Sequence, residues 1–135
     1  MYHLIKIKNA RTNVPEPMRL ALASPVTVGR GIPVTVKDGL LTVCNDKSTV
    51  PPTHITLSGA KDESFVLCYE VSPDMVFETH VTASPADMKL GTEYLISADG
   101  KSIGATAVTG SLAGAVLVDK CGAEKAGDRL LVAFR

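Results

Sequence analysis

The feature that most constrains the fold is the shortness of every apolar run along the chain. Runs rich in valine, leucine and isoleucine alternate with turn residues roughly every 8–12 positions, and no helical apolar period persists for about ten residues. This pattern predicts an all-β sandwich or barrel with at most one short helix, over 84–90, where Ser84 caps and Pro85 starts the turn. The expected strands are 2–8, 18–23, 26–28, 32–36, 40–44, 54–57, 65–71, 75–83, 93–98, 101–108, 113–120 and 128–135.

Two segments, 28–43 and 90–105, share one layout: an aliphatic residue, a glycine, a strand, an Asp-Gly pair and a second strand. Asp-Gly between strands favours a tight hairpin, because such turns need the positive φ that these residues tolerate. A further pair of similar strands, 64–71 and 114–121, extends the match and predicts two related hairpin units. The expected turn residues are structural: Gly29, Asp38, Gly39, Gly91, Asp99 and Gly100.

The composition limits the class of protein. A chain of 135 residues with 45 % hydrophobic content has the size and the core of one domain. Its 14 basic and 14 acidic residues cancel, and aromatic residues make up only 4 %, so a base-stacking or phosphate-binding surface for nucleic acid is not expected. Neutral net charge and a mean hydropathy of +0.18 favour burial of some apolar surface against other subunits.

The first 19 residues differ from the rest. Ile5 and Ile7 alternate with Lys6 and Lys8, as in a half-buried strand, and a polar stretch with Pro15 and Pro17 follows. We therefore expect an N-terminal strand or arm over 1–19 and a β-rich domain over 20–135. Two alternatives stay open: the strand 2–8 pairs within the domain, or it adds to the sheet of a partner.

The polar residues offer no catalytic or metal-binding pattern. The histidines and cysteines are widely separated, there is no CxxC pair, and no nucleophile elbow or phosphate-binding loop occurs; these residues are His3, His54, His80, Cys44, Cys68 and Cys121. We expect reduced, buried thiols, no cofactor, no metal and no catalysis. The chain start lacks the apolar core of a secretory signal, and no apolar run reaches the roughly 20 residues that span a bilayer, so we expect synthesis in a cytosol and no membrane partner.

Over residues 20–135 the chain resembles the capsid decoration (cement) proteins of tailed bacteriophages. The similarity is carried by a Gly-x-x-Tyr-Leu hairpin with Asp-Gly-Lys, an apolar strand, and a terminal Gly-Asp strand. The loop 45–63, with Pro51 and Pro52, and the first 19 residues have no counterpart in that group. The matching residues are Val28, Gly29, Pro33, Val34, Val36, Gly91, Tyr94, Leu95, Asp99, Gly100, Lys101, 114–118, Gly127, Asp128, Leu130 and Val132.

The resemblance implies a compact β-barrel or β-tulip-like body that binds the major capsid protein and stabilises the outside of the shell as a homotrimer. It places the protein in the virion after synthesis in the host cytoplasm. The N-terminal arm then becomes the expected capsid-binding element, with Ile5, Lys6, Ile7, Lys8, Arg11 and Arg19 as its contact residues. The alternative is a carbohydrate- or peptide-binding module of a fibre or adhesin, for which Tyr69, Phe77 and Tyr94 are the candidate exposed aromatic residues.

Overall fold

The computed structural model describes residues 1–8 and 16–135, apart from the side chains of 24–26 and 60–64. Over these residues the fold is all-β, as predicted. The strands are β1 (His3–Ile7), β2 (Met18–Val28), β3 (Pro33–Lys37), β4 (Leu40–Val43), β5 (His54–Thr56), β6 (Ala60–Glu70), β7 (Met75–His80), β8 (Glu93–Ile96), β9 (Ile103–Ala107), β10 (Gly114–Asp119) and β11 (Arg129–Ala133).

The short helix expected over 84–90 is a series of turns instead. Met88 N–H donates to Pro85 O over 3.1 Å, which closes one turn. Lys89 N–H donates to the Tyr94 hydroxyl over 2.6 Å, so it does not continue a helical ladder toward Pro85. The contact with β8 thus outweighs the local capping signal.

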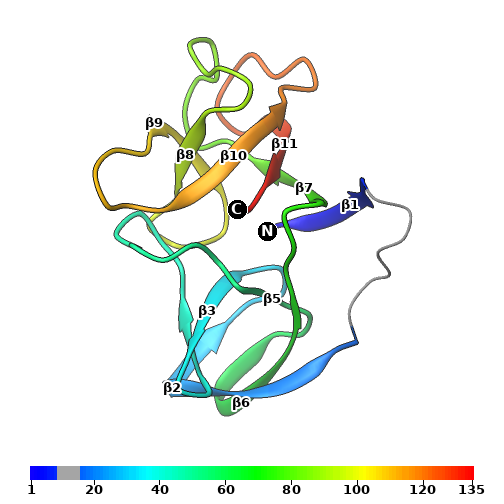
Figure 1. The fold of residues 1–135 in the computed structure, drawn as a ribbon, viewed down its shortest axis with the longest axis vertical. Coiled ribbons are helices and arrows are strands. Elements are labelled where there is room, and N and C mark those ends of the chain that lie inside the picture. The colour runs from blue at the N-terminus through cyan, green and yellow to red at the C-terminus, as the bar shows by residue number, and fades with distance from the viewer. Residues whose placement is uncertain (9–15) are drawn as a thin grey trace.

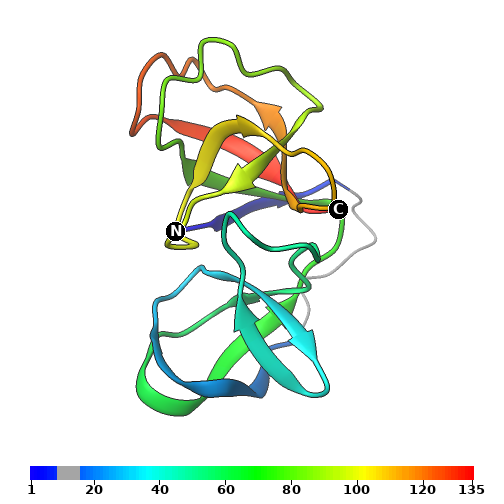
Figure 2. The same ribbon diagram turned by 90° about the vertical axis from the view of Figure 1, so that its left-hand side faces the viewer.

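The strands form two bodies, a closed barrel and a six-stranded sheet. Figure 1 shows the barrel below and the sheet above, with both chain ends lying between them, and Figure 2 shows the same separation from the side. The barrel order is β2-β4-β3-β5-β6, in which only the β2–β4 pair is parallel. The sheet order is β1-β7-β11-β10-β8-β9, with antiparallel pairs throughout.

The two bodies share one pattern of strand pairing. In the barrel, β3 forms a hairpin with β4 and pairs on its other side with β5. Strand β5 then pairs with β6 and β6 with β2, and β2 pairs in parallel with β4. In the sheet, β8 forms a hairpin with β9 and pairs on its other side with β10. Strand β10 then pairs with β11 and β11 with β7, and Val81, just after β7, makes a parallel bridge with Ile103 of β9. Strands β2–β6 therefore correspond in order to β7–β11, and the chain contains two equivalent five-strand units.

This correspondence corrects part of the predicted repeat. The two hairpins are equivalent, as the sequence indicated, but the strands at 64–71 and 114–121 are not. Strand β10 pairs directly with β8, whereas β6 pairs with β5 and β2 and is not a neighbour of β3 in the barrel order. The counterpart of β10 is β5, and the counterpart of β6 is β11. The two segments share a run of small and aliphatic residues, a composition that is common among β-strands.

Two hydrophobic clusters hold the fold together. One fills the barrel with Leu22, Val28, Ile32, Val34, Leu41, Val66 and Cys68. The larger one lies between sheet and barrel and is centred on aromatic contacts, because the ring centroids of Tyr2 and Phe77 are each 5.3 Å from that of Phe134. Ile55 and Tyr69 of the barrel belong to this second cluster, so it joins the two units.

The strand β1 belongs to the domain's own sheet, which settles the alternative that the sequence left open. It pairs with β7 from His3 opposite Glu78 to Ile7 opposite Met75, with an irregularity between Leu4 and Lys6. Tyr2, just before β1, is 2 % exposed. Its N–H donates to Gly31 O over 2.8 Å, and Gly31 has φ +70°, where an added Cβ would lie 2.7 Å from Tyr2 O.

Candidate protein-binding surface

The outside of the barrel presents an apolar surface, which we call the barrel face. It consists of Arg19 and Ala21 of β2, Leu40 of β4, and Phe65 and Leu67 of β6. Strand pairing brings them together, since Arg19 lies opposite Leu67, and Ala21 lies opposite both Phe65 and Leu40. The residues between them in sequence point inward and fill the barrel: Leu20, Leu22, Leu41 and Val66.

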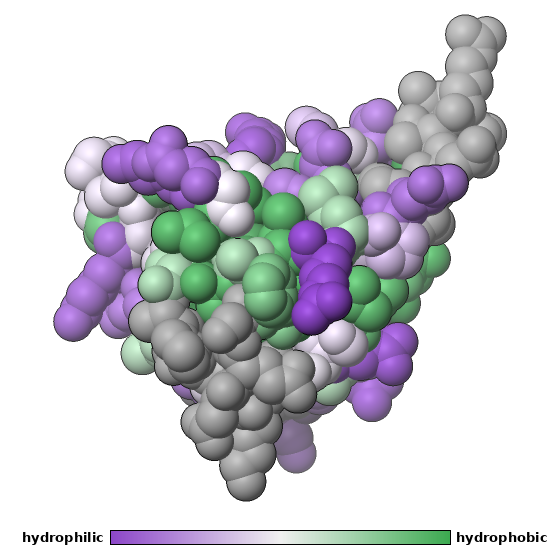
Figure 3. Space-filling model, turned by 90° about the horizontal axis from the view of Figure 1, so that it is seen from below, coloured by the Kyte–Doolittle hydropathy of each residue, from purple (hydrophilic) through white to green (hydrophobic). Residues whose placement is uncertain are grey.

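Three large apolar side chains of the barrel face are exposed. Phe65 is 46 % exposed, Leu67 42 % and Leu40 41 %. A view of this end of the molecule shows a hydrophobic area in its middle (Figure 3). Grouped exposed apolar side chains on a folded domain mark a surface that binds another molecule.

The cation of the barrel face lies over its aromatic ring. The guanidinium carbon of Arg19 is 4.5 Å from the centre of the Phe65 ring, a cation–π arrangement. A shallow hollow of about 410 Å³ lies beside this pair, lined by Arg19, Ser58, Gly59, Phe65, Val66 and Leu67. The barrel face therefore combines a flat apolar area, a held guanidinium and a depression, which suits a protein side chain better than a small ligand.

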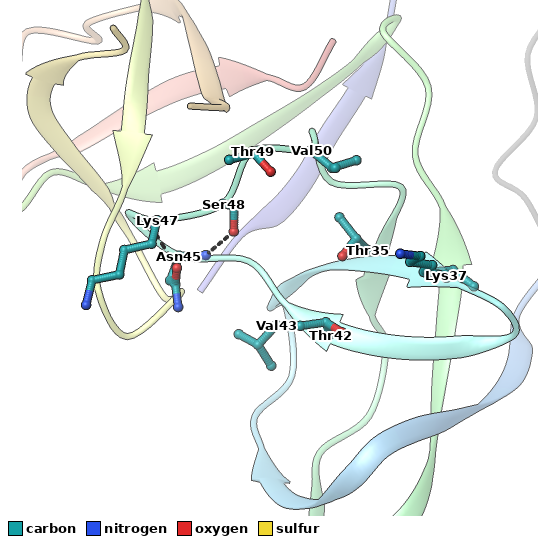
Figure 4. A pocket seen from close by; sticks show the side chains of 10 residues that line it. Thr35, Lys37, Thr42, Val43, Asn45, Lys47, Ser48, Thr49 and Val50 are labelled. Carbon is teal, nitrogen blue, oxygen red and sulfur yellow. Dashed lines mark hydrogen bonds between the residues drawn. The ribbon is translucent and has the colours of Figure 1, made fainter. Parts of the chain in front are cut away.

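A second hollow lies between the β3–β4 hairpin and the loop that follows it (Figure 4). Its volume is about 460 Å³, and Lys37 and Lys47 lie on opposite sides of it. Polar groups of its loop are already engaged, because Ser48 Oγ accepts from Asn45 N–H and Asn45 Oδ1 accepts from Lys47 N–H. These bonds hold the loop and leave few converging groups for a ligand. The lining residues are Thr35, Val36, Lys37, Thr42, Val43, Asn45, Lys47, Ser48, Thr49 and Val50.

The first Asp-Gly pair forms the β3–β4 turn. Asp38 and Gly39 both have positive φ, +52° and +77°, between the paired residues Lys37 and Leu40. Positive φ at both central residues matches a type I′ turn. Gly29 is not in this conformation; in the β2–β3 turn the positive φ falls on Gly31.

The second Asp-Gly pair forms a longer turn between β8 and β9. Gly100 has φ +74°, but Asp99 does not have positive φ and instead uses its side chain. Asp99 Oδ1 accepts from Ser97 Oγ over 2.6 Å and from Lys101 N–H over 2.9 Å. These two hydrogen bonds lower the pKa of the Asp99 carboxyl. Gly91, before β8, has φ +79° and lies in a turn.

The residues expected in a capsid-binding arm fall in different places. Ile5, Lys6 and Ile7 lie in β1, and Lys8 follows it, with its N–H donating to Asp74 O. Arg19 lies on β2 in the barrel face, away from that strand. Arg11 lies outside the described residues. Ile5 is 51 % exposed at the β1 irregularity, so it is the apolar side chain that this edge offers to a partner.

The thiols and histidines that the sequence offered as candidate reactive or metal-binding groups do not form a cluster. Cys44 and Cys68 are buried, which raises the pKa of each thiol to about 11, while Cys121 is exposed. His80 Nδ1 lies 2.8 Å from Gly127 O. Among the side chains that the structure describes, no three of His, Cys, Asp or Glu gather closely enough to hold a metal ion.

The aromatic residues expected at a binding surface are in the core. Tyr69, Phe77 and Tyr94 are 6 %, 0 % and 4 % exposed, so none forms a stacking platform. Phe65, which the sequence analysis did not single out, is the exposed ring. The run 65–69 is apolar at nearly every position, a pattern of a strand buried on both faces. Here β6 buries one face in the barrel and leaves Phe65 and Leu67 exposed on the other, so the apolar run alone did not distinguish this arrangement from a fully buried strand.

Two equivalent five-strand units define an all-β protein, and the exposed apolar face is its candidate binding surface. The fold is similar to that of the N base of the head fiber protein gp8.5 of bacteriophage phi29, with a TM-score of 0.51 and 10 % sequence identity. The similarity covers 89 % of this chain and 95 % of that one. No protein-family model and no curated protein matches the sequence. Within the described residues, no helix is both long enough and apolar enough to traverse a bilayer.

Proposed function

We propose that the chain is a structural virion protein that binds the outside of a phage capsid shell and stabilises it. The observation that carries the proposal is the fold shared over 89 % of the chain with the base of a phage head fiber protein. The resemblance of residues 20–135 to capsid decoration proteins points to the same kind of particle. The barrel face adds a physical reason, because apolar surface of this kind is stabilised by association.

The major capsid protein is the proposed partner, and a homotrimer is the proposed state of the chain. Both come from the resemblance to decoration proteins. Neutral net charge and exposed apolar side chains support association of some kind, since neither opposes contact between copies or with a shell. The proposed location is the outer surface of the virion, after synthesis in the host cytoplasm.

We include no catalysis, cofactor, nucleic acid or membrane in this proposal. Cys44 and Cys68 are buried and their thiols are protonated at neutral pH. The polar groups of the loop beside the β3–β4 hairpin are already hydrogen-bonded to one another. The role that fits these features is binding through a preformed surface.

The test is cosedimentation of the purified chain with expanded shells of the phage whose genome encodes it, together with a mass measurement in solution. We expect the chain to pellet with the shells and to form trimers in solution or on the shell. A monomer that stays in the supernatant at saturating shell concentration would refute the proposal.

A second candidate is a binding module at the base of a fibre, which the similarity to a head fiber base favours. A carbohydrate-binding version lacks its expected aromatic platform, because Tyr69, Phe77 and Tyr94 are buried. A peptide-binding version would use the barrel face. Detection of the chain at discrete fibre attachment points, rather than over the whole shell, in labelled virions would favour this candidate.

A further inference from the structure

The two equivalent units allow the barrel face to be compared with the same surface elsewhere in the chain. In the first unit, Arg19 of β2 lies opposite Leu67 of β6, and Ala21 lies opposite Phe65. The parallel contact with β4 begins at Ala21 and the next residue. Along this paired stretch the outward-facing side chains are therefore a cation, an aromatic ring and two aliphatic groups.

The second unit has the same positions on β7 and β11. Glu78 lies opposite Leu131, and His80 lies opposite Arg129. The parallel contact with β9 follows at Val81, one residue after His80. Leu22 and Val81 are the buried residues at which the two units make these parallel contacts, so they correspond. Arg19 and Glu78 each lie three residues before them, and Phe65 and Arg129 each lie opposite the residue directly before them.

The corresponding diagonal pairs differ in chemistry. In the second unit, Arg129 Nη1 donates to Glu78 Oε1 over 3.1 Å, so the cation is neutralised by a carboxylate of the same surface. In the first unit the cation, Arg19, lies over the Phe65 ring instead. Among the described side chains, no carboxylate lies within salt-bridge distance of Arg19. The same strand arrangement can therefore carry an ion pair between its own side chains, as the second unit does. The apolar surface of the barrel follows from the residues at these positions and is not required by the fold.

We infer that the barrel face docks onto a shell-protein surface that presents a carboxylate flanked by apolar side chains. This inference rests on the proposed function and names the surface through which it acts. Stacking on Phe65 holds the planar guanidinium in place, so that its N–H groups can meet a carboxylate with little further loss of freedom. Burial of Phe65, Leu67 and Leu40 around that pair would exclude water from it.

Charge argues for a different protein as the occupant, rather than a second copy of the chain. A two-fold contact through the barrel face would place the same patch on both sides of the interface. Arg19 is the charged side chain of that patch as defined, so a two-fold contact would place no carboxylate of the patch against it. An acidic partner surface complements it.

The test compares two matched pairs of variants in cosedimentation with shells. Phe65→Ser combined with Leu67→Ser removes apolar side chains of the barrel face. The control combines Val50→Ser with Leu90→Ser, which removes two apolar side chains outside the barrel face that are 55 % and 63 % exposed. Arg19→Glu reverses the cation that lies over Phe65, and Arg129→Glu reverses the cation of the diagonal pair in the second unit. Circular dichroism and thermal unfolding establish that each variant is folded before binding is measured.

We expect the barrel-face variants to weaken shell binding by at least about tenfold and the control variants to stay within about twofold of the unchanged chain. Equal binding by the unchanged chain and all variants would overturn the inference and leave the proposed function intact. No binding by the unchanged chain would overturn both. If the Phe65→Ser and Leu67→Ser combination dissociates an oligomer of the purified chain, a second copy covers the face and the inference is wrong.

Discussion

The guanidinium carbon of Arg19 lies 4.5 Å from the centre of the Phe65 ring, on the outside of a closed barrel. Both side chains are exposed, and Arg19 comes from β2 while Phe65 comes from β6. A pair of this kind contributes only about 0.5–1 kcal/mol at an exposed site. Its main effect is to fix where a cation is held on an apolar surface.

Replacing Arg19 should therefore separate stability from binding. For Arg19→Ala we expect the free energy of unfolding to fall by less than about 1 kcal/mol, because the side chain is exposed and its contact with Phe65 is a surface contact. Urea unfolding followed by circular dichroism measures this. A loss of several kcal/mol would mean that Arg19 holds the barrel together, contrary to its role as a binding residue.

The N-terminal strand gives a prediction about the core. Tyr2 is 2 % exposed, its ring packs against Phe134, and its hydroxyl donates to Ser102 O over 2.6 Å. We expect Tyr2→Ala to cost about 3–5 kcal/mol, and Tyr2→Phe to cost about 1 kcal/mol through the lost hydrogen bond.

The matched control for Tyr2 is Ile5→Ala in the same segment, where the side chain is 51 % exposed and a change within about 0.5 kcal/mol is expected. Chemical denaturation of the three variants gives the comparison. If Tyr2→Ala and Ile5→Ala were equally mild, β1 would be a detachable arm and not a strand of the folded domain.

The cysteines should differ sharply in reactivity. Burial raises the pKa of the Cys44 and Cys68 thiols to about 11, so at pH 8 only about one part in a thousand of each is thiolate, and both are closed to reagent. Cys121 is exposed, although partial burial and Asp119 raise its pKa as well.

We expect iodoacetamide to modify Cys121 slowly in the native protein and all three cysteines in urea, as read by peptide mass spectrometry. Cys121→Ser should abolish native labelling. Labelling of Cys68 as fast as Cys121 without denaturant would show that the barrel opens readily, against the closed pairing of β2 with β6 and β4.

The β8–β9 turn predicts a pH effect. Hydrogen bonds from Ser97 and Lys101 lower the pKa of Asp99 below its usual 3.8 in the folded chain. The unfolded chain therefore takes up the proton first as the pH falls. The stabilisation by Asp99 is complete above about pH 3.8 and is lost as the pH falls through the lower, folded pKa.

Asp99→Asn, which mimics the protonated group, should be less stable than the unchanged chain by about 1 kcal/mol or less at pH 7, since the turn is exposed to solvent. The difference should shrink below pH 4. Unfolding curves between pH 2.5 and 7, a range chosen to span the carboxyl titration, measure it. A difference that is constant across this range would contradict the assigned role of the carboxylate.

Local patterns in the sequence predicted most of the secondary structure. The alternation of β-branched residues with turn residues located the strands, and Asp38-Gly39 predicted the tight β3–β4 turn, because both signals act between neighbours in the chain. The second Asp-Gly pair was less informative. Its Asp99 bonds to Ser97 and Lys101 through its side chain, and the turn is longer.

The pairing of distant strands could not be predicted in the same way. The parallel contact of Ala21 with Leu40 closes the barrel, and the parallel bridge of Val81 with Ile103 is its counterpart in the second unit; neither leaves a periodic trace in the sequence. For the same reason, the apolar run at Phe65 and Leu67 did not reveal that one face of β6 lacks a covering layer. Burial on both faces and exposure of an apolar face give the same sequence pattern.

The most direct test of the docking surface is photo-crosslinking in assembled particles, with a benzophenone amino acid in place of Phe65 or of the control residue Leu90. Both side chains are exposed, at 46 % and 63 %, but only Phe65 belongs to the barrel face. The proposed function and its docking surface predict a crosslink from position 65 to the major capsid protein and none from position 90. A crosslink to the capsid protein from position 90 alone, or a crosslink between copies of the chain from position 65, would contradict the docking surface.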